Sequence, residues 1–254
     1  MTKHFILPDS QVKPGQDYSH LLWAGKYCAE KKPDVIVCIG DFADMESLSS
    51  YDEGKKSFEG RTYLADVEAC KEAMDTFMVP ILRERLRLLT NKKKQWSPRL
   101  VLTLGNHEHR IDRAIELDRK LDGLISIDQL GYKEMGWEVF PFLQPVEING
   151  VLYSHYFASG VMGRPCSTAR AQMTKVKMSC VSGHQQGRDV FYTTRGDGAR
   201  LASIIAGSYY QHDEGYLNHQ TNAHWRGCVM LNEVDNGQLD EMFVSLDYLK
   251  MIYG

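Results

Sequence analysis

The sequence predicts an α/β sandwich with mixed β-sheets. Three observations lead to this prediction: short apolar runs rich in β-branched and large aliphatic residues, longer amphipathic segments between them, and alternation with turn signals after Val190. The chain has 254 residues, of which 43% are hydrophobic. A chain of this size can bury one substantial core, so we expect a single domain over residues 1–254.

The apolar runs predict buried strands at residues 5–7, 35–39, 100–104, 151–153 and 178–181. Between them, apolar residues at helical spacing predict helices over residues 20–30 and 64–89. Pro80 lies inside the second helix, so we expect that helix to be kinked or split. Arg-Gly-Asp-Gly at 195–198 and Asp-Asn-Gly at 235–237 predict hairpin turns, and hence antiparallel strands in the C-terminal third.

Composition argues against several classes of protein. The formal net charge of -3 gives no overall basic footprint, so it does not point to long duplex nucleic acid, while a short or single-stranded substrate stays open. The apolar run at 5–7 is too short for a signal-peptide core, and no later run approaches the roughly 20 residues of a membrane span. The six cysteines include no Cys-x-x-Cys pair, so neither a disulfide framework nor a zinc knuckle is indicated. We therefore expect a cytoplasmic protein without a membrane segment.

Polar side chains suited to metal binding follow every one of the five predicted strands. In chain order they are Asp9 and Gln11, Asp41 and Asp44, Asn106 and His107, His155, and finally His184 and Gln186. Each alone has an ordinary explanation, because Gly-Asp and Gly-Asn are common turns and a lone histidine is usually structural. Loops beyond the carboxyl ends of the strands in an open α/β sheet converge on one crevice, however, so we expect the whole set to meet there. Oxygen and imidazole donors without a thiolate suit manganese, iron, zinc or magnesium.

The order of these motifs resembles that of the calcineurin-like metallophosphoesterases. The pattern of that family runs D-x-H, G-D-x-x-D, G-N-H-E/D, a lone histidine and G-H-x-H. Here residues 40–44, 105–108 and 183–184 match it, and His155 stands in the place of the lone histidine. The style of the chain also resembles members found in bacteriophages. The resemblance implies a four-layer α/β/β/α sandwich and hydrolysis of a phosphate ester with two divalent metal ions, Mn²⁺ first, with Mg²⁺, Fe²⁺, Zn²⁺ and Ca²⁺ as alternatives.

The resemblance also implies how the ligands divide between the two metals. Asp41 would bridge both ions, Asp9 would bind one of them, and the other would be completed by Asn106, His155 and His184. Gln11 and Gln186 stand where the family has histidines, and both of those histidines serve the metal of Asp9. Amide oxygen is a weaker and harder donor than imidazole, so we expect this second site to be weak and to favour Mg²⁺, Mn²⁺ or Ca²⁺ over Zn²⁺.

Proton transfer is a further implication of the resemblance. Water whose pKa the metals lower would attack phosphorus, and His107 would protonate the leaving oxygen while Asp44 holds its imidazole. Arg110 lies three residues after His107 and either clamps a phosphate oxygen or is a helix-surface arginine. Met45 replaces the arginine that follows the second aspartate in phosphoprotein phosphatases, which disfavours protein phosphatase activity.

Two more segments are candidates for contact with substrate. Residues 159–164 predict a mobile loop in which Arg164 either meets a phosphate or is a plain surface residue. Residues 209–212 (Tyr-Tyr-Gln-His), with His219 and His224 nearby, either stack a base, supply a replacement ligand or pack as an ordinary loop.

Two classes of function fit this pattern. The first is hydrolysis of a phosphate ester, with a nucleotide or nucleic-acid-end diester ahead of a monoester as substrate. The second is a binding scaffold that keeps the fold and has lost one metal. Retention of His107 and Asp44 favours the enzyme, because a scaffold needs neither an acid nor its orienting group. The sequence leaves the substrate, the native metal and the oligomeric state open.

Overall fold

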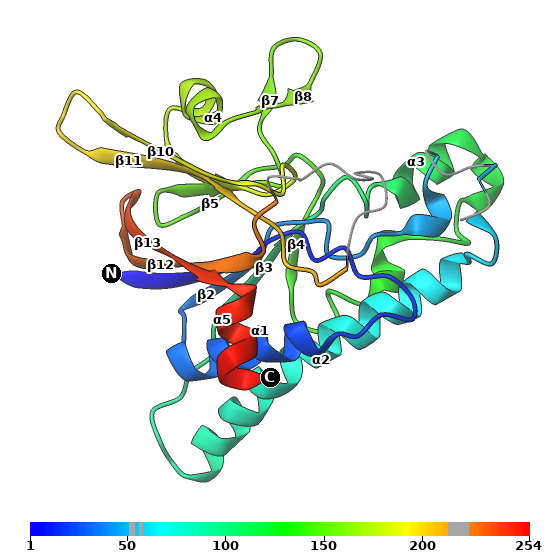
Figure 1. The fold of residues 1–254 in the computed structure, drawn as a ribbon, viewed down its shortest axis with the longest axis horizontal. Helices are drawn as coiled ribbons and strands as arrows, with labels where there is room; N and C mark the ends of the chain where they lie inside the picture. The colour runs from blue at the N-terminus through cyan, green and yellow to red at the C-terminus, as the bar shows by residue number, and fades with distance from the viewer. Residues whose placement is uncertain (51–53, 56–57, 213–223) are drawn as a thin grey trace.

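Two mixed β-sheets are stacked face to face at the centre of the molecule, and helices cover their outer faces (Figure 1). This computed structural model describes residues 1–50, 54–55, 58–212 and 224–254. The first sheet has the order β13-β12-β1-β2-β3-β4, the second has the order β10-β11-β9-β6-β5, and β7 and β8 form a separate two-stranded sheet. The predicted α/β sandwich is thereby confirmed at the level of two mixed sheets with outer helices.

The bounds of the elements follow the sequence pattern closely. The strands are β1 (Thr2–Leu7), β2 (Val35–Cys38), β3 (Arg99–Thr103), β4 (Glu138–Phe140), β5 (Val146–Ile148), β6 (Val151–Tyr153), β7 (Ala158–Ser159), β8 (Arg164–Pro165), β9 (Ser179–Ser182), β10 (Arg188–Thr194), β11 (Arg200–Ala206), β12 (Gly227–Asp235) and β13 (Gln238–Ser245). The helices are α1 (Ser19–Lys31), α2 (Tyr63–Thr90), α3 (Arg110–Leu117), α4 (Ala169–Val176) and α5 (Leu246–Tyr253), and the short 3₁₀ turns are η1 (Glu46–Leu48), η3 (Arg119–Leu121) and η4 (Ile127–Leu130). All five predicted strands and both predicted helices are present.

The parallel parts of the two sheets determine where functional residues can meet. Strands β1 to β4 are parallel in the first sheet, with Ile6 opposite Val37 and Val37 opposite Val101. In the second sheet β6, β9 and β11 are parallel. The loops after β1, β2, β3, β6 and β9 therefore leave the carboxyl ends of parallel strands, as the strand-end argument requires.

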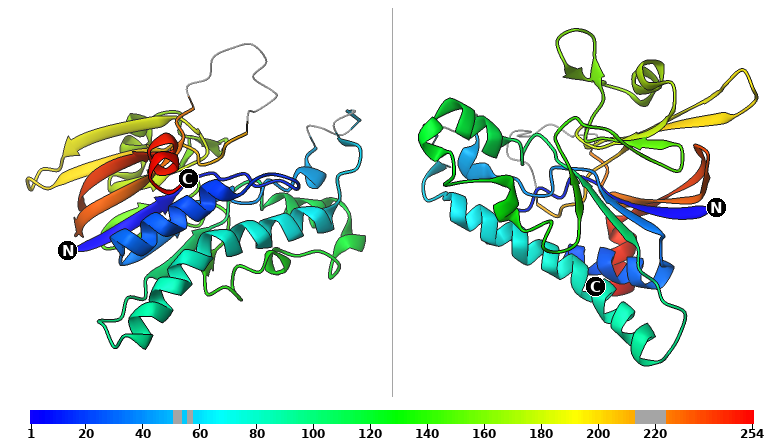
Figure 2. Two further views of the ribbon diagram at one scale, coloured as in Figure 1. Left: turned by 60° about the horizontal axis from the view of Figure 1, so that its bottom comes forward. Right: turned by 180° about the vertical axis from the view of Figure 1, so that it is seen from behind.

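Three apolar layers hold the sheets and helices together. The layer between the sheets contains completely buried side chains from both, among them Ile6, Val37, Val101, Tyr153, Val181 and Ile204. Because side chains alternate along a strand, Phe5 and Leu7 point the other way, into a second layer beneath α1, α2 and α5. A third, smaller layer lies between the second sheet and α4, and Figure 2 shows α4 on the side of the molecule away from α1 and α2.

Of the two outcomes predicted at Pro80, the split of helix α2 does not occur. It runs as one helix of 28 residues through the proline. Buried side chains on both sides of Pro80, such as Phe77 and Ile81, anchor the helix and compensate for the hydrogen bond that proline cannot donate. The apolar pattern extends further than the burial does, because Leu82, Leu86 and Leu89 are exposed.

The turn predictions have two outcomes. The hairpins β10–β11 and β12–β13 are both antiparallel, and Asn236 and Gly237 have φ of 49° and 82°, as a two-residue type I′ turn requires. Residues 159–164, expected to be a mobile loop, instead belong to the short β7–β8 hairpin, in which Ser159 pairs with Arg164. Among the described residues no helix is long and apolar enough to cross a membrane.

The contact of α1 with α2 predicts the effect of Gly25→Ala. A methyl group at Gly25 would lie 2.2 Å from the carbonyl oxygen of Phe77 in α2. Alanine favours a helix over glycine by about 1 kcal/mol, but overpacking costs about 1–3 kcal/mol, so we expect a net loss of stability in urea unfolding. Gly196→Ala, in the β10–β11 turn with no atom within 4 Å, is the control and should change little. A Gly25→Ala protein as stable as the parent would contradict this close contact.

Candidate metal centre

Backbone hydrogen bonds join the loops that follow the strands of both sheets. The N–H of Gln11 donates to the carbonyl of Asp41 (2.8 Å), which connects the loops after β1 and β2. The N–H of His184 donates to both oxygens of Asp9 (3.1 and 3.0 Å), and that of Gly183 donates to the carbonyl of His155 (3.0 Å). The predicted strand-end residues therefore lie together at one edge of the two sheets.

Four donor atoms from four of these loops form a tight cluster. His155 Nε2 lies 2.9 Å from Asn106 Oδ1, 3.2 Å from His184 Nδ1 and 3.2 Å from Asp41 Oδ2. Asn106 Oδ1 and His184 Nδ1 are 2.8 Å apart. Within the described part of the chain, Asp41, His155 and His184 are the Asp, Glu, His or Cys side chains close enough to share one ion, and Asn106 adds a fourth donor.

The spacing of these atoms fits a divalent cation. Two ligand atoms that are each about 2.1 Å from one ion lie about 3.0 Å apart at a right angle and about 3.4 Å apart at the tetrahedral angle. The observed separations of 2.8 to 3.2 Å are close to that range. Two imidazoles, a carboxylate and an amide oxygen are also a mixed donor set that accepts manganese, iron or zinc.

The orientation of His155 supports the same fit. Its Nδ1 lies 3.0 Å from the carbonyl of Ile39, an acceptor, so Nδ1 carries a proton and the lone pair of the neutral ring is on Nε2, facing the cluster. Burial opposes protonation of His155, but the carboxylates of Asp41 and Asp9 outweigh it and raise its pKa to about 9. The same carboxylates favour a cation at the cluster when the His155 ring is neutral.

The two aspartates differ in their electrostatic environment. Burial raises the pKa of Asp9, and the nearby carboxylate of Asp41 acts in the same direction. Burial also opposes ionisation of Asp41, but His107 and His155 outweigh it, so the pKa of Asp41 lies below its usual range. Asp41 therefore carries the negative charge on which the cluster is centred.

The residues expected to form a second site lie beside this cluster. Asp9, Gln11 and Gln186 are all buried near the cluster. The Tyr210 hydroxyl donates to Gln186 Oε1 (2.8 Å) and also lies 2.8 Å from His224 Nδ1. The amide oxygen of Gln186 is thus already engaged as an acceptor.

The half-buried His107 and the buried Asp44 form a pair beside the cluster. His107 Nδ1 lies 2.6 Å from Asp44 Oδ1, which leaves Nε2 turned toward Asp41, 3.7 Å from its Oδ2. Burial opposes protonation of His107, but Asp41 and Asp44 outweigh it and raise its pKa. His107 therefore has a held orientation, and its raised pKa favours the protonated form that a general acid needs.

Two cations surround the same pair. Arg110 Nη1 donates to the backbone carbonyl and to Oδ1 of Asp44 (2.7 and 3.0 Å), while its Nη2 lies 3.3 Å from His107 Nε2. Lys13 Nζ lies 2.9 Å from Asp44 Oδ2. Burial opposes ionisation of Asp44, but the hydrogen bond from His107 and the charges of Lys13 and Arg110 lower its pKa. Sequence reasoning missed Lys13, and its position two residues after Gln11 is the signal that could have identified it.

Glu108 holds the loops after β2 and β3 together. Its completely buried carboxylate accepts hydrogen bonds from the backbone N–H groups of Asp41 (3.0 Å), Ala43 (2.9 Å) and Gly105 (2.8 Å). The N–H of His107 then donates to Asp41 Oδ1 (2.9 Å). In the sequence, Glu108 is only the last residue of the motif at 105–108. Its role in holding the two loops together depends on how these loops meet in the fold.

Unusual backbone conformations are concentrated in these loops. Five non-glycine residues of the centre have positive φ: Gln11 (43°), Asp41 (49°), Met45 (52°), His184 (67°) and Gln186 (55°). Such conformations cost of order 1–3 kcal/mol each and persist where the surroundings impose them, which is common at functional sites.

Two glycines are required because carboxylates approach their Cα atoms. A methyl group at Gly105 would lie 2.1 Å from Asp41 Oδ1, and one at Gly183 would lie 2.2 Å from Asp9 Oδ1. Any larger residue at either position would displace a carboxylate of the centre. The glycines of these motifs thus serve close packing against the acidic side chains.

Half-buried aromatic rings line the histidine side of the cluster. Tyr156 packs 4.8 Å from His184, and Phe142 packs 5.6 Å from Tyr156, measured between ring centroids. Of the alternatives for Tyr209 and Tyr210, stacking on a base is excluded, because both rings are completely buried. Tyr209 donates instead to the carbonyl of His20 (2.8 Å).

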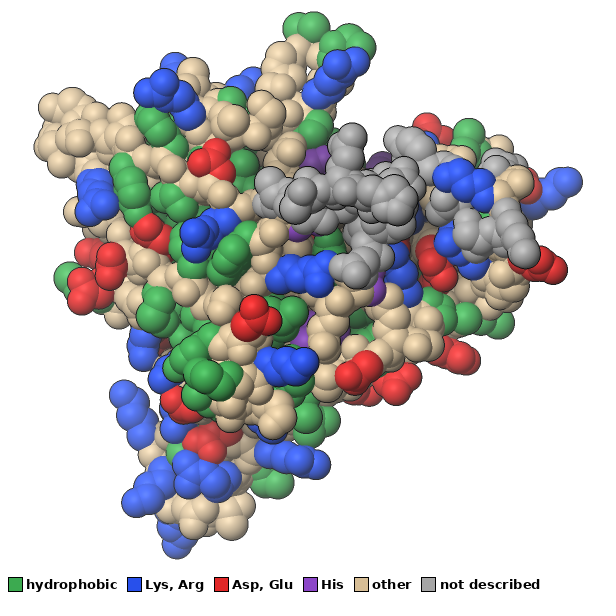
Figure 3. All heavy atoms as spheres, viewed as in Figure 1, with side chains coloured by type: hydrophobic (Ala, Val, Ile, Leu, Met, Phe, Trp, Pro, Cys, Tyr) green, Lys and Arg blue, Asp and Glu red, His purple; other side chains and the backbone are tan. Residues whose placement is uncertain are grey.

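The remaining predicted residues have separate positions. His212 stacks on Tyr210 at 4.4 Å, and His219 lies outside the described residues. Arg164 is exposed on β8, in a hairpin that projects from the molecule in Figure 1, and the structure does not bring it to the cluster. Figure 3 shows the molecule from the same side as Figure 1. Basic and acidic side chains are interspersed on the face seen there, and several histidines reach its surface.

Comparison with known proteins adds no relative: no family model matches the chain, and no curated protein sequence matches it.

The hydrogen bonds of Glu108 predict the effect of Glu108→Gln. Glutamine can accept at only one side-chain oxygen and would turn its amide N–H₂ toward a buried backbone N–H. Leaving a buried donor unpaired costs about 1–3 kcal/mol, so we expect a loss of that size in the free energy of unfolding. Glu116→Gln, at an exposed position in α3, is the matched control and should change stability little. Equal stability of the two variants would show that Glu108 does not hold the loops.

Proposed function

We propose that the chain is a metal-dependent phosphoesterase of the calcineurin-like class. The observation that carries this proposal is the four-donor cluster of Asp41, Asn106, His155 and His184 beside the His107–Asp44 pair. The sandwich of two mixed sheets, with its ligands after parallel strands of both, is consistent with the four-layer fold of that family. The six buried, unpaired cysteines fit a reducing compartment such as the cytoplasm.

In this proposal, Asp41, Asn106, His155 and His184 hold one divalent ion. Mn²⁺ is our first choice, because the donor set mixes nitrogen and oxygen without sulfur. Asp9, Gln11, Asp41 and Gln186 are the candidate ligands of a second, weaker site, since amide oxygens stand there in place of imidazoles. When bound, the metal lowers the pKa of a water and polarises the phosphoryl group.

The residues of the chain supply the proton and the orientation. Water attacks phosphorus, the bond from phosphorus to the leaving oxygen breaks, and His107 gives the Nε2 proton to that oxygen. Asp44 accepts from Nδ1 and so holds the imidazole in place (2.6 Å). Arg110, close to Nε2, favours loss of the proton through its positive charge and can hold a phosphate oxygen.

A diester is the substrate that this centre suits best. A dianionic monoester usually requires several cations or two fully ligated metals. Here Lys13 and Arg110 are already paired with Asp44, and the second metal site is the poorer one. A phosphomonoesterase is the near alternative. A binding scaffold is the more distant one, and the retained His107–Asp44 pair, which a scaffold does not need, favours the enzyme over it.

The proposal is tested by metal content and hydrolysis together. We expect calorimetric titration with Mn²⁺ to show one tight and one weak ion, and hydrolysis of bis(p-nitrophenyl) phosphate to exceed that of p-nitrophenyl phosphate. Asp41→Asn should lower bound Mn²⁺ and reduce the rate by about 10²-fold or more. Asp75→Asn, an exposed change in α2, should alter neither. Normal metal content and activity in Asp41→Asn would refute the proposed centre.

The acid role of His107 is tested by the leaving group. His107→Ala should slow hydrolysis of a dinucleotide by about 10²- to 10⁴-fold, because its leaving alkoxide needs a proton. The loss should be much smaller for a nitrophenolate leaving group. His109→Ala, which removes a half-buried histidine paired with Asp112, is the control. Equal losses on both substrates would assign His107 to positioning instead.

A further inference from the structure

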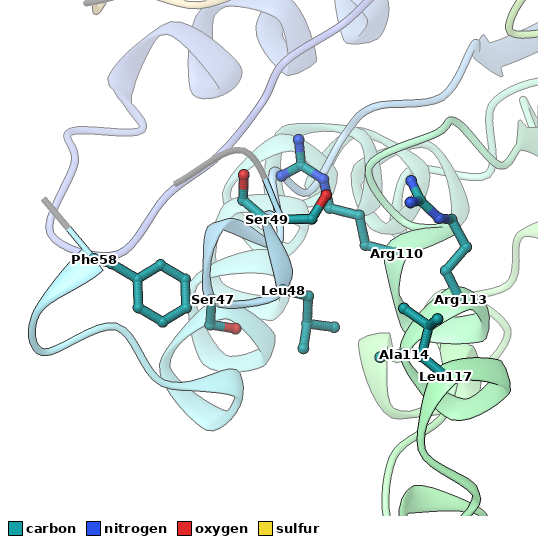
Figure 4. A pocket seen from close by; sticks show the side chains of 9 residues that line it. Ser47, Leu48, Ser49, Phe58, Arg110, Arg113, Ala114 and Leu117 are labelled. Carbon is teal, nitrogen blue, oxygen red and sulfur yellow. The ribbon is translucent and has the colours of Figure 1, made fainter. Parts of the chain in front are cut away.

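A hollow of about 270 Å³ opens beside the candidate metal centre, between η1 and α3 (Figure 4). One wall is formed by Ser47, Leu48 and Ser49, and the other by the side chains that α3 presents to it. This volume is slightly below the usual range for a whole small-molecule site, about 300–1,000 Å³, so the hollow suits one part of a larger ligand.

The hollow shares Arg110 with the acid side of the centre. Its first wall begins three residues after Asp44, and α3 begins three residues after His107. Arg110 belongs to both places: it lines the hollow, while its guanidinium contacts Asp44 and lies 3.3 Å from His107 Nε2. A group that leaves past His107 would therefore move toward this hollow.

The side chains of the hollow combine positive charge with apolar surface. Arg113 is exposed and makes no side-chain hydrogen bond or ion pair within the described part of the chain, whereas Arg110 is paired with Asp44. Figure 4 shows both guanidinium groups pointing to the same side of α3. Leu48, Phe58 and Leu117 provide the apolar part, and Leu117 is 82% exposed. An anion next to a flat apolar ring matches this combination, and a nucleotide has both.

We propose that this hollow binds the leaving nucleoside of a diester substrate, with Arg113 binding a further phosphate on that nucleoside. This inference rests on the proposed function and narrows its substrate to a nucleic-acid strand or end, in which the leaving nucleoside carries its own phosphate. Arg113 contributes by charge-assisted hydrogen bonds to that phosphate, and takes no part in the bond-breaking step.

Binding of thymidine 3′,5′-bisphosphate tests the hollow without requiring catalysis. The Mn²⁺-loaded protein should bind this probe roughly tenfold more tightly than it binds thymidine 3′-phosphate or 5′-phosphate, as expected for one extra charge-assisted contact. Arg113→Ala should abolish that difference, while Arg83→Ala, an exposed arginine in α2, should preserve it. A parent protein with no preference for the bisphosphate, or a preference that survives Arg113→Ala, would overturn the inference.

Hydrolysis separates this inference from the proposed function. The substrates to compare are the dinucleotide TpT, TpTp with an extra 3′-phosphate, and pTpT with an extra 5′-phosphate. The value of kcat/KM should be highest for the dinucleotide whose leaving nucleoside carries the extra phosphate. Arg113→Ala should remove only that advantage. Hydrolysis of bis(p-nitrophenyl) phosphate should be unchanged by Arg113→Ala. Absence of all hydrolysis would defeat the proposed function while the binding comparison still decides the role of Arg113. If Arg113→Ala lowered kcat/KM equally on every substrate, the role assigned to Arg113 would be overturned and the proposed function would stand.

Discussion

The buried carboxylate of Glu108 is the contact on which the arrangement of the centre depends. Strands β2 and β3 end side by side, but their loops have backbone N–H groups that no strand partner can accept. Glu108 accepts three of them, from Asp41, Ala43 and Gly105. With the loops joined, the N–H of His107 donates to Asp41 Oδ1. Asp41 is then held both at its backbone N–H, by Glu108, and at its side chain, by His107. A carboxylate at the surface would lose most of this stabilisation to water.

The stacking of the two sheets is the second requirement of the centre. Asp41 and Asn106 follow strands of the first sheet, whereas His155 and His184 follow strands of the second. Neither sheet alone supplies more than half of the four donors. The dry layer between the sheets, which includes Val37 and Val181, therefore fixes the distances between donors that are far apart in sequence. An ion bound by all four would in turn stabilise the contact between the sheets, because it binds only the folded arrangement.

The sequence predicted the strands and the convergence of their ends because both depend on local pattern: apolar runs mark buried strands, and parallel strands end at one edge. It could not predict Lys13 or Glu108 as partners, since their contacts depend on how loops from different strands meet. The alternatives for Tyr209 stayed open for a similar reason. A tyrosine in a polar segment suggests an exposed ring, but here the ring packs on His20 and its hydroxyl finds a backbone acceptor. Pro80 did not split α2 because tertiary burial outweighed a local preference.

The distribution of charge around the centre is uneven, and this unevenness bears on the substrate. The neutral residues Gln11 and Gln186 lie near Asp9, whereas Lys13 and Arg110 surround Asp44 and Arg113 lies further along the same side. In the proposed reaction, negative charge develops on the leaving oxygen beside His107, which is on the cationic side. Lys13 and Arg110 share the single carboxylate of Asp44, which offsets only one of their two positive charges but holds both side chains in place, so they stabilise the orientation of His107 more than they reach toward a distant anion. Arg113 is not neutralised in this way. It is therefore the cation best placed to select a substrate by a charge other than that of the phosphate being cleaved.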